Sequence, residues 1–405
     1  MGAPLQHLAL PFFGPEHQSM AGALAQWAAL QQVDESDDRL ACRQWVRLLG
    51  DNGWLRYCVP AQYGGALPKL DSRALVILRE TLAYHSPLAD FAFAMQAMGC
   101  GAITLAGSPA QRASYLPRVA RGDAIAAFAL SEADAGSDVG AMKTLATSAP
   151  PVPDNDRLTR GSTADVWILN GSKTWISNGG IADFYCLFAK TTPDAGTRGI
   201  SAFIVDADTA GLDSSKHIAL MAPHPLATLQ LSACRLPATA LLGPLDGGFK
   251  LAMQTLDIFR ASVAAAALGM ARRALDEARA HVRQRVMFGQ RLADFQLTQA
   301  RLGEMATLID AAALLTYRAA WLRDCTDLGT PAAAHGYTTA AAMAKMGATE
   351  NAQRVIDMAL QMHGGLGLKV GTKVESLYRD IRALRIYEGA TEVQQLIIGK
   401  SVLRG

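Results

Sequence analysis

The chain has 405 residues, which is more than one ordinary hydrophobic core needs, so two or three domains are expected. Half of the residues are hydrophobic and only 18% are charged, and the formal net charge is +2. This balance provides no field strong enough to indicate nucleic-acid binding and instead favours work on a small molecule.

The first 123 residues are expected to form an N-terminal α-helical domain. Three segments carry apolar residues at helical spacing and are separated by Gly, Pro and Asn: Phe13 to Ala29, Asp38 to Gly50, and Asp71 to Tyr84. Residues 1–10 lack a basic stretch followed by a long apolar core, so no secretory signal is expected.

Residues 124–245 are expected to form a middle β domain with a barrel-like sheet. The strand candidates are short, rich in β-branched or aromatic residues and bounded by turn formers: Ala124 to Leu130, Val166 to Leu169, Phe184 to Ala189, Ile200 to Val205, and Thr228 to Leu231. The Pro- and Asp-rich piece from Ser148 to Arg160 is expected to be a surface excursion.

Residues 246–405 are expected to form a C-terminal four-helix bundle. Apolar residues recur at helical spacing from Leu302 to Ile309 and from Val355 to Met362, and we interpret these stripes as core. The alanine-rich stretch from Ala261 to Leu268 is interpreted as a buried helix. No apolar run approaches the roughly 20 residues of a membrane span, so no membrane partner is expected.

The six cysteines do not indicate a metal site. They lie far apart, with no Cys-x-x-Cys pair and no nearby histidines at zinc-site spacing. We interpret them as reduced thiols of a cytoplasmic enzyme.

The segment from Arg385 to Gln394 sets one carboxylate, Glu388, beside a glycine among apolar and aromatic neighbours. A carboxylate in such surroundings loses hydration, which favours its neutral form, raises its pKa and makes it a stronger base. Glu388 is therefore the candidate for removing a weakly acidic carbon-bound proton. The segment alone equally allows an exposed glutamate at a helix start.

Two upstream motifs lie in the β domain. A small-residue loop, Phe128 to Asp138, would let backbone N–H groups approach an anionic ligand, with serine as a compact donor, although an ordinary strand-exit turn has the same composition. The run from Lys173 to Gly180 contains Trp175 and an Asn-Gly pair. Taken alone, these features are typical of a core tryptophan and a hairpin turn.

Two further motifs lie in the C-terminal part. Arg285 to Gly289, followed by Gln296, combines a guanidinium that suits phosphate oxygens with an aromatic ring and a glycine. Gln361 to Gly365 ends a predicted helix with a glycine pair. A solvated arginine and a simple helix C-cap are the alternatives.

Together these motifs, ending in Glu388 and set in an α–β–α chain, resemble the acyl-CoA dehydrogenase family over nearly the whole length. The resemblance implies FAD as the cofactor. Because the sequence has neither a Gly-x-Gly-x-x-Gly fingerprint after a strand nor a Walker-type loop, a Rossmann-bound dinucleotide is not supported.

The resemblance assigns cofactor contacts to residues from all these motifs. They are Ser131, Ser137, Trp175, Ser177, Arg285, Phe288, Gln296, Gln361, Gly364, Gly365, Thr391 and Glu392. In the family the motifs beginning at Arg285 and Gln361 contact the FAD of a neighbouring subunit. A homotetramer built as a dimer of dimers is therefore implied, since a monomer could not complete the cofactor site.

The implied reaction is α,β-dehydrogenation of an acyl-CoA thioester, in which Glu388 takes the α-proton and a hydride passes to flavin N5. Substrate contacts fall on Arg260, Phe259, Ser137 and Gly389. The Glu388 backbone N–H is the implied donor to the thioester carbonyl, and an electron-transfer flavoprotein is the implied electron acceptor. The bulk of Phe259 favours a short, branched or cyclic acyl group.

Two departures from the family pattern leave alternatives open. Leu220 to Thr228 replaces a Gly-x-Arg-x-Ser-x-Thr-like run near the CoA contacts. Ala390 replaces a hydroxyl residue that is common two places after the base, so either one hydrogen bond to FAD is missing or Thr391 supplies it. The alternatives are a desulfinase, an O2-using oxidase, or a flavoprotein without catalytic turnover. The near-neutral charge speaks against a nucleic-acid-binding member.

Overall fold

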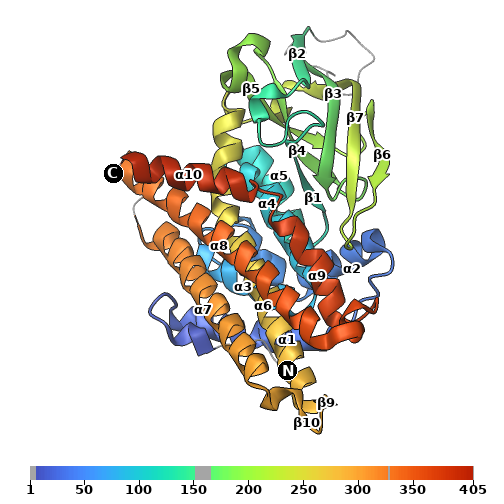
Figure 1. Cartoon of the computed structure of the whole chain (residues 1–405). Helices are drawn as coiled ribbons and strands as arrows, with labels where there is room; N and C mark the ends of the chain where they lie inside the picture. Colours follow the sequence, from blue (N-terminus) through green and yellow to red (C-terminus); the bar gives the residue numbers. More distant parts are fainter. Residues whose placement is uncertain (1–5, 151–165, 327–328, 405) are drawn as a thin grey trace. The chain divides into compact units, whose positions relative to one another are not determined.

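A computed structural model describes residues 6–150, 166–326 and 329–404, with helices before and after a central sheet (Figure 1). This confirms the expected α–β–α order. Contacts divide the chain into two compact units. The first unit comprises Met1–Val33, Asp71–Phe91 and Asp257–Gly405, and the second comprises Asp34–Leu70 and Ala92–Leu256. The sequence boundaries at residues 123 and 245 stay a proposal.

The first unit is helical. Its helices are α1 (Pro15–Leu30), α3 (Ser72–His85), the start of α4 (Pro87–Ala106), most of α6 (Gly248–Gln284), α7 (Gln296–Cys325), α8 (Pro331–His363), α9 (Lys373–Leu384) and α10 (Thr391–Arg404). The long helices α7 and α8 run side by side, and α8 also packs against α9 and α10 (Figure 1). A short hairpin of β9 (Val286–Met287) and β10 (Gln290–Arg291) lies between α6 and α7.

Glu80 of α3 joins three helices of this unit. Its carboxylate accepts hydrogen bonds from Arg272 Nε of α6 and from the Tyr317 hydroxyl of α7, each at 2.7 Å. Helices α3 and α6 approach so closely that a Cβ on Gly269 would lie 2.1 Å from the Glu80 carbonyl oxygen. Only glycine fits at this crossing. The alanine-rich stretch from Ala261 to Leu268 is buried, as predicted.

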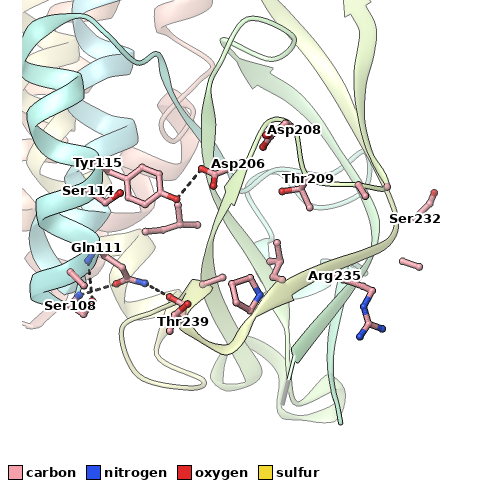
Figure 2. Close-up of a pocket in the computed structure, with 18 residues that line it drawn as sticks. Ser108, Gln111, Ser114, Tyr115, Asp206, Asp208, Thr209, Ser232, Arg235 and Thr239 are labelled. Atoms are coloured by element: carbon pink, nitrogen blue, oxygen red, sulfur yellow. Dashed lines mark hydrogen bonds between the residues drawn. The ribbon is translucent and has the colours of Figure 1, made fainter. Parts of the chain in front are cut away.

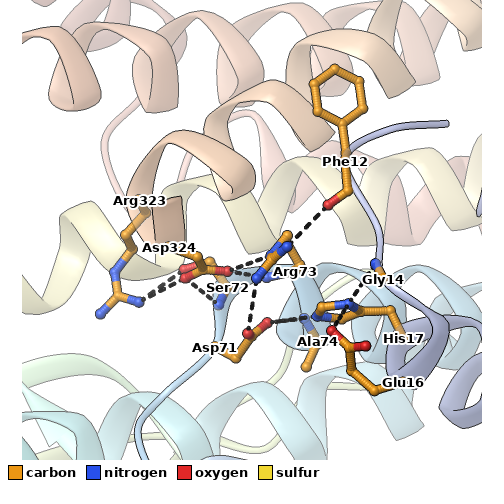
Figure 3. Close-up of polar contacts among 10 residues, drawn as sticks. All are labelled: Phe12, Gly14, Glu16, His17, Asp71, Ser72, Arg73, Ala74, Arg323 and Asp324. Carbon is orange, nitrogen blue, oxygen red and sulfur yellow. Dashed lines mark hydrogen bonds and ion pairs between the residues drawn. The ribbon is translucent and has the colours of Figure 1, made fainter. Parts of the chain in front are cut away.

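Polar side chains cap the start of α3 (Figure 3). Asp71 accepts from the Ala74 backbone N–H at 2.8 Å, which is the N-cap interaction that satisfies a free helix donor. Asp324 of α7 accepts from the backbone N–H groups of Ser72 and Arg73, both at 2.9 Å. The buried His17 contacts Asp71 through Nε2 at 3.2 Å. These contacts tie α1, α3 and α7 together.

The second unit contains a sheet with the strand order β6-β7-β3-β2-β4-β5-β8, and β1 pairs with β4 in parallel. The strands are β1 (Ala126–Ala129), β2 (Leu145–Ala149), β3 (Val166–Ser177), β4 (Phe184–Lys190), β5 (Ile200–Asp206), β6 (Leu212–Ile218), β7 (Leu226–Pro237) and β8 (Leu241–Leu242). Helices α2 (Asp38–Asp51) and α5 (Pro109–Arg121) and the rest of α4 complete the unit.

All five predicted strands are present, but β2, β6 and β8 were not predicted. The expected surface excursion was wrong at its start, because Ser148 and Ala149 pair with Trp167 and Val166 as the end of β2. Most of its remainder lies outside the described residues. The polar β6, with the sequence LDSSKHI, lacks the apolar alternation by which strands are recognised.

Two helices are longer and more apolar than the sequence pattern indicated. By length and composition, α4 and α6 are long and apolar enough to cross a bilayer. However, 89% and 78% of their apolar windows are buried inside the protein, as in core helices of a folded domain. They are therefore weak evidence for a membrane span.

Candidate functional site

Glu388 lies in the short turn between α9 and α10. Its backbone has φ = +52° and that of Gly389 has φ = +91°, so two consecutive residues adopt the left-handed conformation. The residue is half-buried, while its Oε2 atom is shielded from solvent and has no hydrogen-bond partner among the described residues. A buried carboxylate oxygen without a partner is costly for folding and available for chemistry.

Charged groups from several helices of the first unit surround Glu388. Burial raises the pKa of its carboxyl group above the ordinary value, and Asp90 raises it further, while Arg79, Lys345 and Arg260 oppose this rise. Desolvation dominates, so the carboxylate is a stronger base than a solvated glutamate. The three cations limit the rise and keep the ionised form accessible.

Arg79 of α3 and Asp90 of α4 form a buried ion pair with two contacts. Nε lies 2.8 Å from Oδ1 and Nη2 lies 2.9 Å from Oδ2, and Nη1 donates to the Ser262 hydroxyl at 3.0 Å. This fork geometry holds the guanidinium plane fixed. Arg79 is therefore a fixed positive charge that acts on Glu388.

Arg260 and Phe259, both expected at the substrate, lie in α6 and are buried. Arg260 pairs with Asp257 one turn earlier, and its Nε is buried without a hydrogen-bond partner among the described residues. Asp257 also accepts from the Thr338 hydroxyl at 3.0 Å, which ties α6 to α8. Arg260 also lowers the pKa of Glu388, so folding brings these two residues near each other.

Glu350 of α8 holds the two ends of the Glu388 turn. Its Oε1 atom accepts from Arg385 Nε at 2.8 Å and from the Thr391 hydroxyl at 2.6 Å. The Thr391 proton is therefore used inside the chain, which leaves that hydroxyl only as an acceptor toward a ligand. Glu392, the other cofactor candidate of this segment, is exposed at the start of α10.

The first two sequence motifs meet within the second unit. The buried Lys173 donates from Nζ to Glu132 Oε1 at 2.8 Å and to the Leu130 carbonyl at 3.1 Å. The Thr174 backbone N–H donates to the Ser131 carbonyl at 3.0 Å. These contacts fix the loop from residue 128 to 138 against β3, and they leave Ser137 exposed on that loop.

Trp175 and Ser177 stand at the end of β3. Trp175 has φ = +59° and is 56% exposed, so the alternative of a core tryptophan is wrong. The Ser177 hydroxyl lies 3.3 Å from His224 Nε2, and burial lowers the pKa of His224 to about 3, which keeps the imidazole neutral. His224 belongs to the segment that departs from the family pattern.

The third and fourth motifs meet at one end of the first unit. The rings of His281 in α6 and His363 in α8 stack with centroids 4.3 Å apart, which sets the hairpin that follows α6 beside the end of α8. The expected cofactor residues here are exposed: Arg285, Phe288, Gln296, Gln361, Gly364 and Gly365. A Cβ on Gly364 or Gly365 would have no heavy atom within 4 Å.

These surfaces fit the groups that FAD offers. Phe288 is 87% exposed, so it is not packed in the core, and Arg285 is exposed as well. Exposed rings suit flat heteroaromatic groups, and guanidinium forks suit phosphate oxygens. The serine hydroxyls of the second unit add small donors. The donor set is therefore suited to the cofactor that the sequence implies.

A pocket of about 1020 Å³ lies in the second unit, between α5 and strands β5 and β7 (Figure 2). The Tyr115 hydroxyl donates to Asp206 Oδ1 at 2.9 Å on one wall, and Gln111 Nε2 donates to the Thr239 carbonyl at 2.8 Å. None of the residues predicted as site residues lines this pocket. We therefore do not assign it to the candidate site.

All six cysteines lie in the described parts of the chain, and each is a free thiol. Five are buried and Cys325 is exposed. In residues 6–150, 166–326 and 329–404 no group of three or more His, Cys, Asp or Glu side chains is placed to hold a metal ion.

Sequence reasoning missed Arg79, Asp90, Lys345, Glu350 and His224. The first three are charged residues inside strongly apolar helical runs, and such interruptions were the available signal. These residues lie far from their contact partners in the sequence, so their contacts could not be predicted from local patterns. Arg79 and Asp90 lie in different helices, and Lys345 lies 44 residues before Gly389.

Three family models match the chain. They are the acyl-CoA dehydrogenase N-terminal domain over residues 15–123, the middle domain over residues 127–234 and the C-terminal domain over residues 246–403.

Similar proteins cover nearly the whole chain. A 3-(aryl)acrylate reductase of Clostridium sporogenes is 35% identical over 97% of this chain and 100% of that protein. The caffeyl-CoA reductase-Etf complex subunit CarC of Acetobacterium woodii is 36% identical over 93% of each. The structure of an acyl-CoA dehydrogenase complexed with FAD from Bacillus anthracis superposes with a TM-score of 0.87 at 28% identity, covering 99% of this chain and 69% of that one.

Proposed function

Because the chain belongs to the acyl-CoA dehydrogenase family, a group of FAD-dependent oxidoreductases that act on CH–CH bonds, we propose that it dehydrogenates a short, branched or cyclic acyl-CoA with Glu388 as the α-proton base. The observation that carries this proposal is the Glu388 carboxylate itself. It sits in a left-handed turn, and its shielded Oε2 atom has no partner among the described residues.

The surroundings of Glu388 suit proton abstraction from carbon. Burial raises the pKa of its carboxyl group and so strengthens the base, while Arg79 and Lys345 keep the carboxylate accessible. The Glu388 backbone N–H is the candidate donor to the thioester carbonyl. A fixed donor at that oxygen contributes roughly 3 kcal/mol of barrier lowering, because it stabilises charge that develops in the transition state.

FAD, when bound, would supply the hydride acceptor for the substrate β-carbon. We assign its contacts within one subunit to Ser131, Ser137, Trp175, Ser177 and Glu392, with Thr391 as an acceptor only. Following the family resemblance, we assign six residues to the FAD of a neighbouring subunit, and their exposure at one end of the helical unit is consistent with this: Arg285, Phe288, Gln296, Gln361, Gly364 and Gly365. A homotetramer in the cytoplasm is part of the proposal.

The acyl group is proposed from the residues beside Glu388. Phe259 is buried in α6, where a large ring fills space that a long chain would need. Gly389, Ser137 and Arg260 are the other proposed substrate contacts. One relative is named a 3-(aryl)acrylate reductase and another a subunit of a caffeyl-CoA reductase-Etf complex, which supports a cyclic, ring-bearing acyl group. The name of the second also supports an electron-transfer flavoprotein as the redox partner.

Anaerobic bleaching of the bound flavin tests the proposal. The holoenzyme is mixed with a panel of short, branched, cyclic and aryl-bearing acyl-CoAs, and the visible flavin band is followed. At least one member of the panel is expected to bleach the wild-type protein, and Glu388→Gln is expected to keep FAD without being bleached. Normal bleaching of Glu388→Gln would exclude Glu388 as the base.

The names of the two relatives favour a second candidate function, reduction of an aryl-acryloyl thioester, which is the same bond change in reverse. The test uses dithionite-reduced holoenzyme without oxygen. Reoxidation by an aryl-acryloyl-CoA that is faster than reduction by the saturated thioester would favour this direction. Rapid reoxidation by air alone would instead favour an oxidase.

Arg285→Ala tests the assignment across subunits. We expect loss of FAD together with loss of the tetramer, since the guanidinium would leave the pyrophosphate of the neighbouring cofactor unpaired. Bound FAD is measured by absorbance and assembly by analytical ultracentrifugation. A variant that binds FAD with wild-type affinity would contradict the assignment.

A further inference from the structure

We propose that Lys345 is a positioning residue for the base: its ammonium group fixes the Gly389 carbonyl, which holds the turn that aims Glu388, and its charge stabilises the carboxylate form of Glu388. The proposal rests on the proposed role of Glu388. It concerns a residue that no sequence motif contained.

The geometry at Gly389 is the first support. Lys345 lies in the middle of α8 with no exposed surface, and its Nζ donates to the Gly389 carbonyl at 2.8 Å. Gln394 Nε2 of α10 donates to the same oxygen at 2.9 Å. One backbone carbonyl therefore receives two side-chain donors, and this fixes the peptide that follows the base.

The turn needs such anchors. A non-glycine residue with positive φ is strained, and Glu388 at φ = +52° is followed directly by Gly389 at φ = +91°. A Cβ on residue 389 would lie 2.4 Å from Gln394 Nε2, so this position must stay glycine for the anchor to form. Strain of this kind persists only where surrounding contacts hold it.

The charges at the site single out Lys345. Of the three cations near Glu388, Arg79 has Asp90 as its ion-pair partner and Arg260 has Asp257. Lys345 has no ion pair among the described residues, and its one hydrogen bond goes to a neutral carbonyl. A buried ammonium without a dedicated carboxylate is unfavourable unless a nearby negative charge offsets the lost hydration. Glu388 is the leading source of that charge.

The titration of both groups agrees with this arrangement. Burial lowers the pKa of Lys345 to about 8, and Glu388 opposes the fall most, ahead of Glu350 and Glu392, whereas Arg260 adds to it. At Glu388, the groups that act are Arg79, Lys345, Arg260 and Asp90. Tyr387, next to Glu388, stays neutral because burial raises its pKa far above the ordinary value. Lys345 therefore remains largely protonated at neutral pH.

Three variants separate charge from position. Lys345→Met removes both the donor and the charge, and Lys345→Gln removes the charge with a smaller change in the polar core. Gln394→Met is the matched control, because it removes the second donor to Gly389 and leaves the Lys345 charge in place. The Glu388 carboxyl is titrated directly by infrared difference spectroscopy against Glu388→Gln, and the pH profile of flavin reduction is measured in parallel.

Loss of a nearby opposite charge is expected to raise the pKa of Glu388 in both Lys345 variants by about one unit or more. The pH profile of flavin reduction should then shift to higher pH by the same amount, because the ionised fraction of the base sets the rate. Gln394→Met should slow the reaction without shifting the pH profile. A folded, FAD-bound Lys345→Gln with the wild-type infrared titration and pH profile would overturn the proposal.

A double-mutant cycle with Glu388→Gln adds a readout that does not need turnover. If the two charges stabilise each other, Lys345→Met should destabilise the protein less in the Glu388→Gln background than in the wild type. If the two substitutions change the stability in a strictly additive way, the proposed charge stabilisation between Lys345 and Glu388 is overturned. If no acyl-CoA bleaches the wild-type flavin, the proposed reaction fails, whereas the infrared titration and the cycle still decide the role of Lys345.

Discussion

Arg79 and Asp90 come from two consecutive helices and meet in a two-contact ion pair, with side chains only 2% and 3% exposed. The pair therefore lies away from solvent and next to the base, because both charges act on Glu388. Arg79 lowers the pKa of Glu388 and Asp90 raises it. The pair both stabilises the helical unit and adjusts the base.

Asp90→Asn is expected to destabilise the protein by about 3 to 5 kcal/mol, since it leaves a buried guanidinium without its counter-charge. Urea unfolding at pH 7 measures the loss. The matched control is the double variant Arg79→Met with Asp90→Leu, which replaces both charges by apolar groups and should lose much less stability.

In the folded Asp90→Asn protein, the pH profile of flavin reduction should shift to lower pH, because a group that raises the pKa of Glu388 is gone. An unchanged profile would contradict this relation.

The raised pKa of Glu388 predicts the direction of two pH effects. Flavin reduction should be slow in acid and rise with pH through a pKa above the ordinary glutamate value, since the base must be ionised. The stability effect has the opposite sign. A carboxyl whose folded pKa is raised favours the fold below its unfolded pKa, and this contribution is lost as the pH rises through the folded pKa.

Glu388→Gln should therefore stabilise the protein at pH 7 to 8, and the gain should disappear near pH 4. Melting temperatures of holoenzyme and variant, measured across this range, test the prediction. A variant that is less stable at every pH would show that the three cations outweigh desolvation at this carboxyl.

Asp71 is expected to stabilise the fold at neutral pH and to lose this effect in acid. Burial raises the pKa of its carboxyl, but hydrogen bonds from His17 and from the Ala74 backbone N–H outweigh this and lower it to about 2 (Figure 3). A depressed folded pKa stabilises the protein above the unfolded value near 3.8, and this contribution is lost as the pH falls toward 2.

Asp71→Ala should thus cost about 1 kcal/mol or more at pH 7, because it loses the N-cap as well as the charge. Asp71→Asn is the control, since its amide oxygen can still cap α3 while the charge interaction with His17 is gone. Urea unfolding at pH 7 and near pH 2.5 compares the three proteins. Equal losses for both variants would assign the whole effect to the charge.

Thiol labelling should separate one cysteine from the other five. Burial raises the pKa of the thiols of Cys42, Cys58, Cys100, Cys186 and Cys234, and shielded thiols with little thiolate react slowly. The native protein is therefore expected to react with a thiol-specific chromogenic reagent at one site, and at six sites after unfolding. Cys325→Ser should abolish the fast native reaction. Persistence of a full equivalent in that variant would contradict the assignment.

Residue patterning was enough to predict the order of helical and strand-rich regions and to locate the motifs that bear the chemistry. The helical spacing of apolar residues predicted α1, α2 and α3 nearly to the residue. Helices α1 and α2 each bury one regular stripe, whereas α3 is buried on nearly all sides. It missed β6, whose polar side chains carry no such pattern and whose pairing with β7 comes from backbone hydrogen bonds. The Glu388 segment was visible because a carboxylate, a glycine and apolar residues adjoin in the chain.

The charged groups around that carboxylate are brought there by folding alone. Three helices contribute charged residues near the Glu388 turn: Arg79, Asp90 and Lys345. Because folding alone brings them together, no local sequence pattern could predict this arrangement. The same holds for Glu350, which joins Arg385 and Thr391 from another helix. Hydrophobic patterning depends on neighbours in sequence, whereas desolvation and charge coupling depend on neighbours in space, and these set the strength of the base.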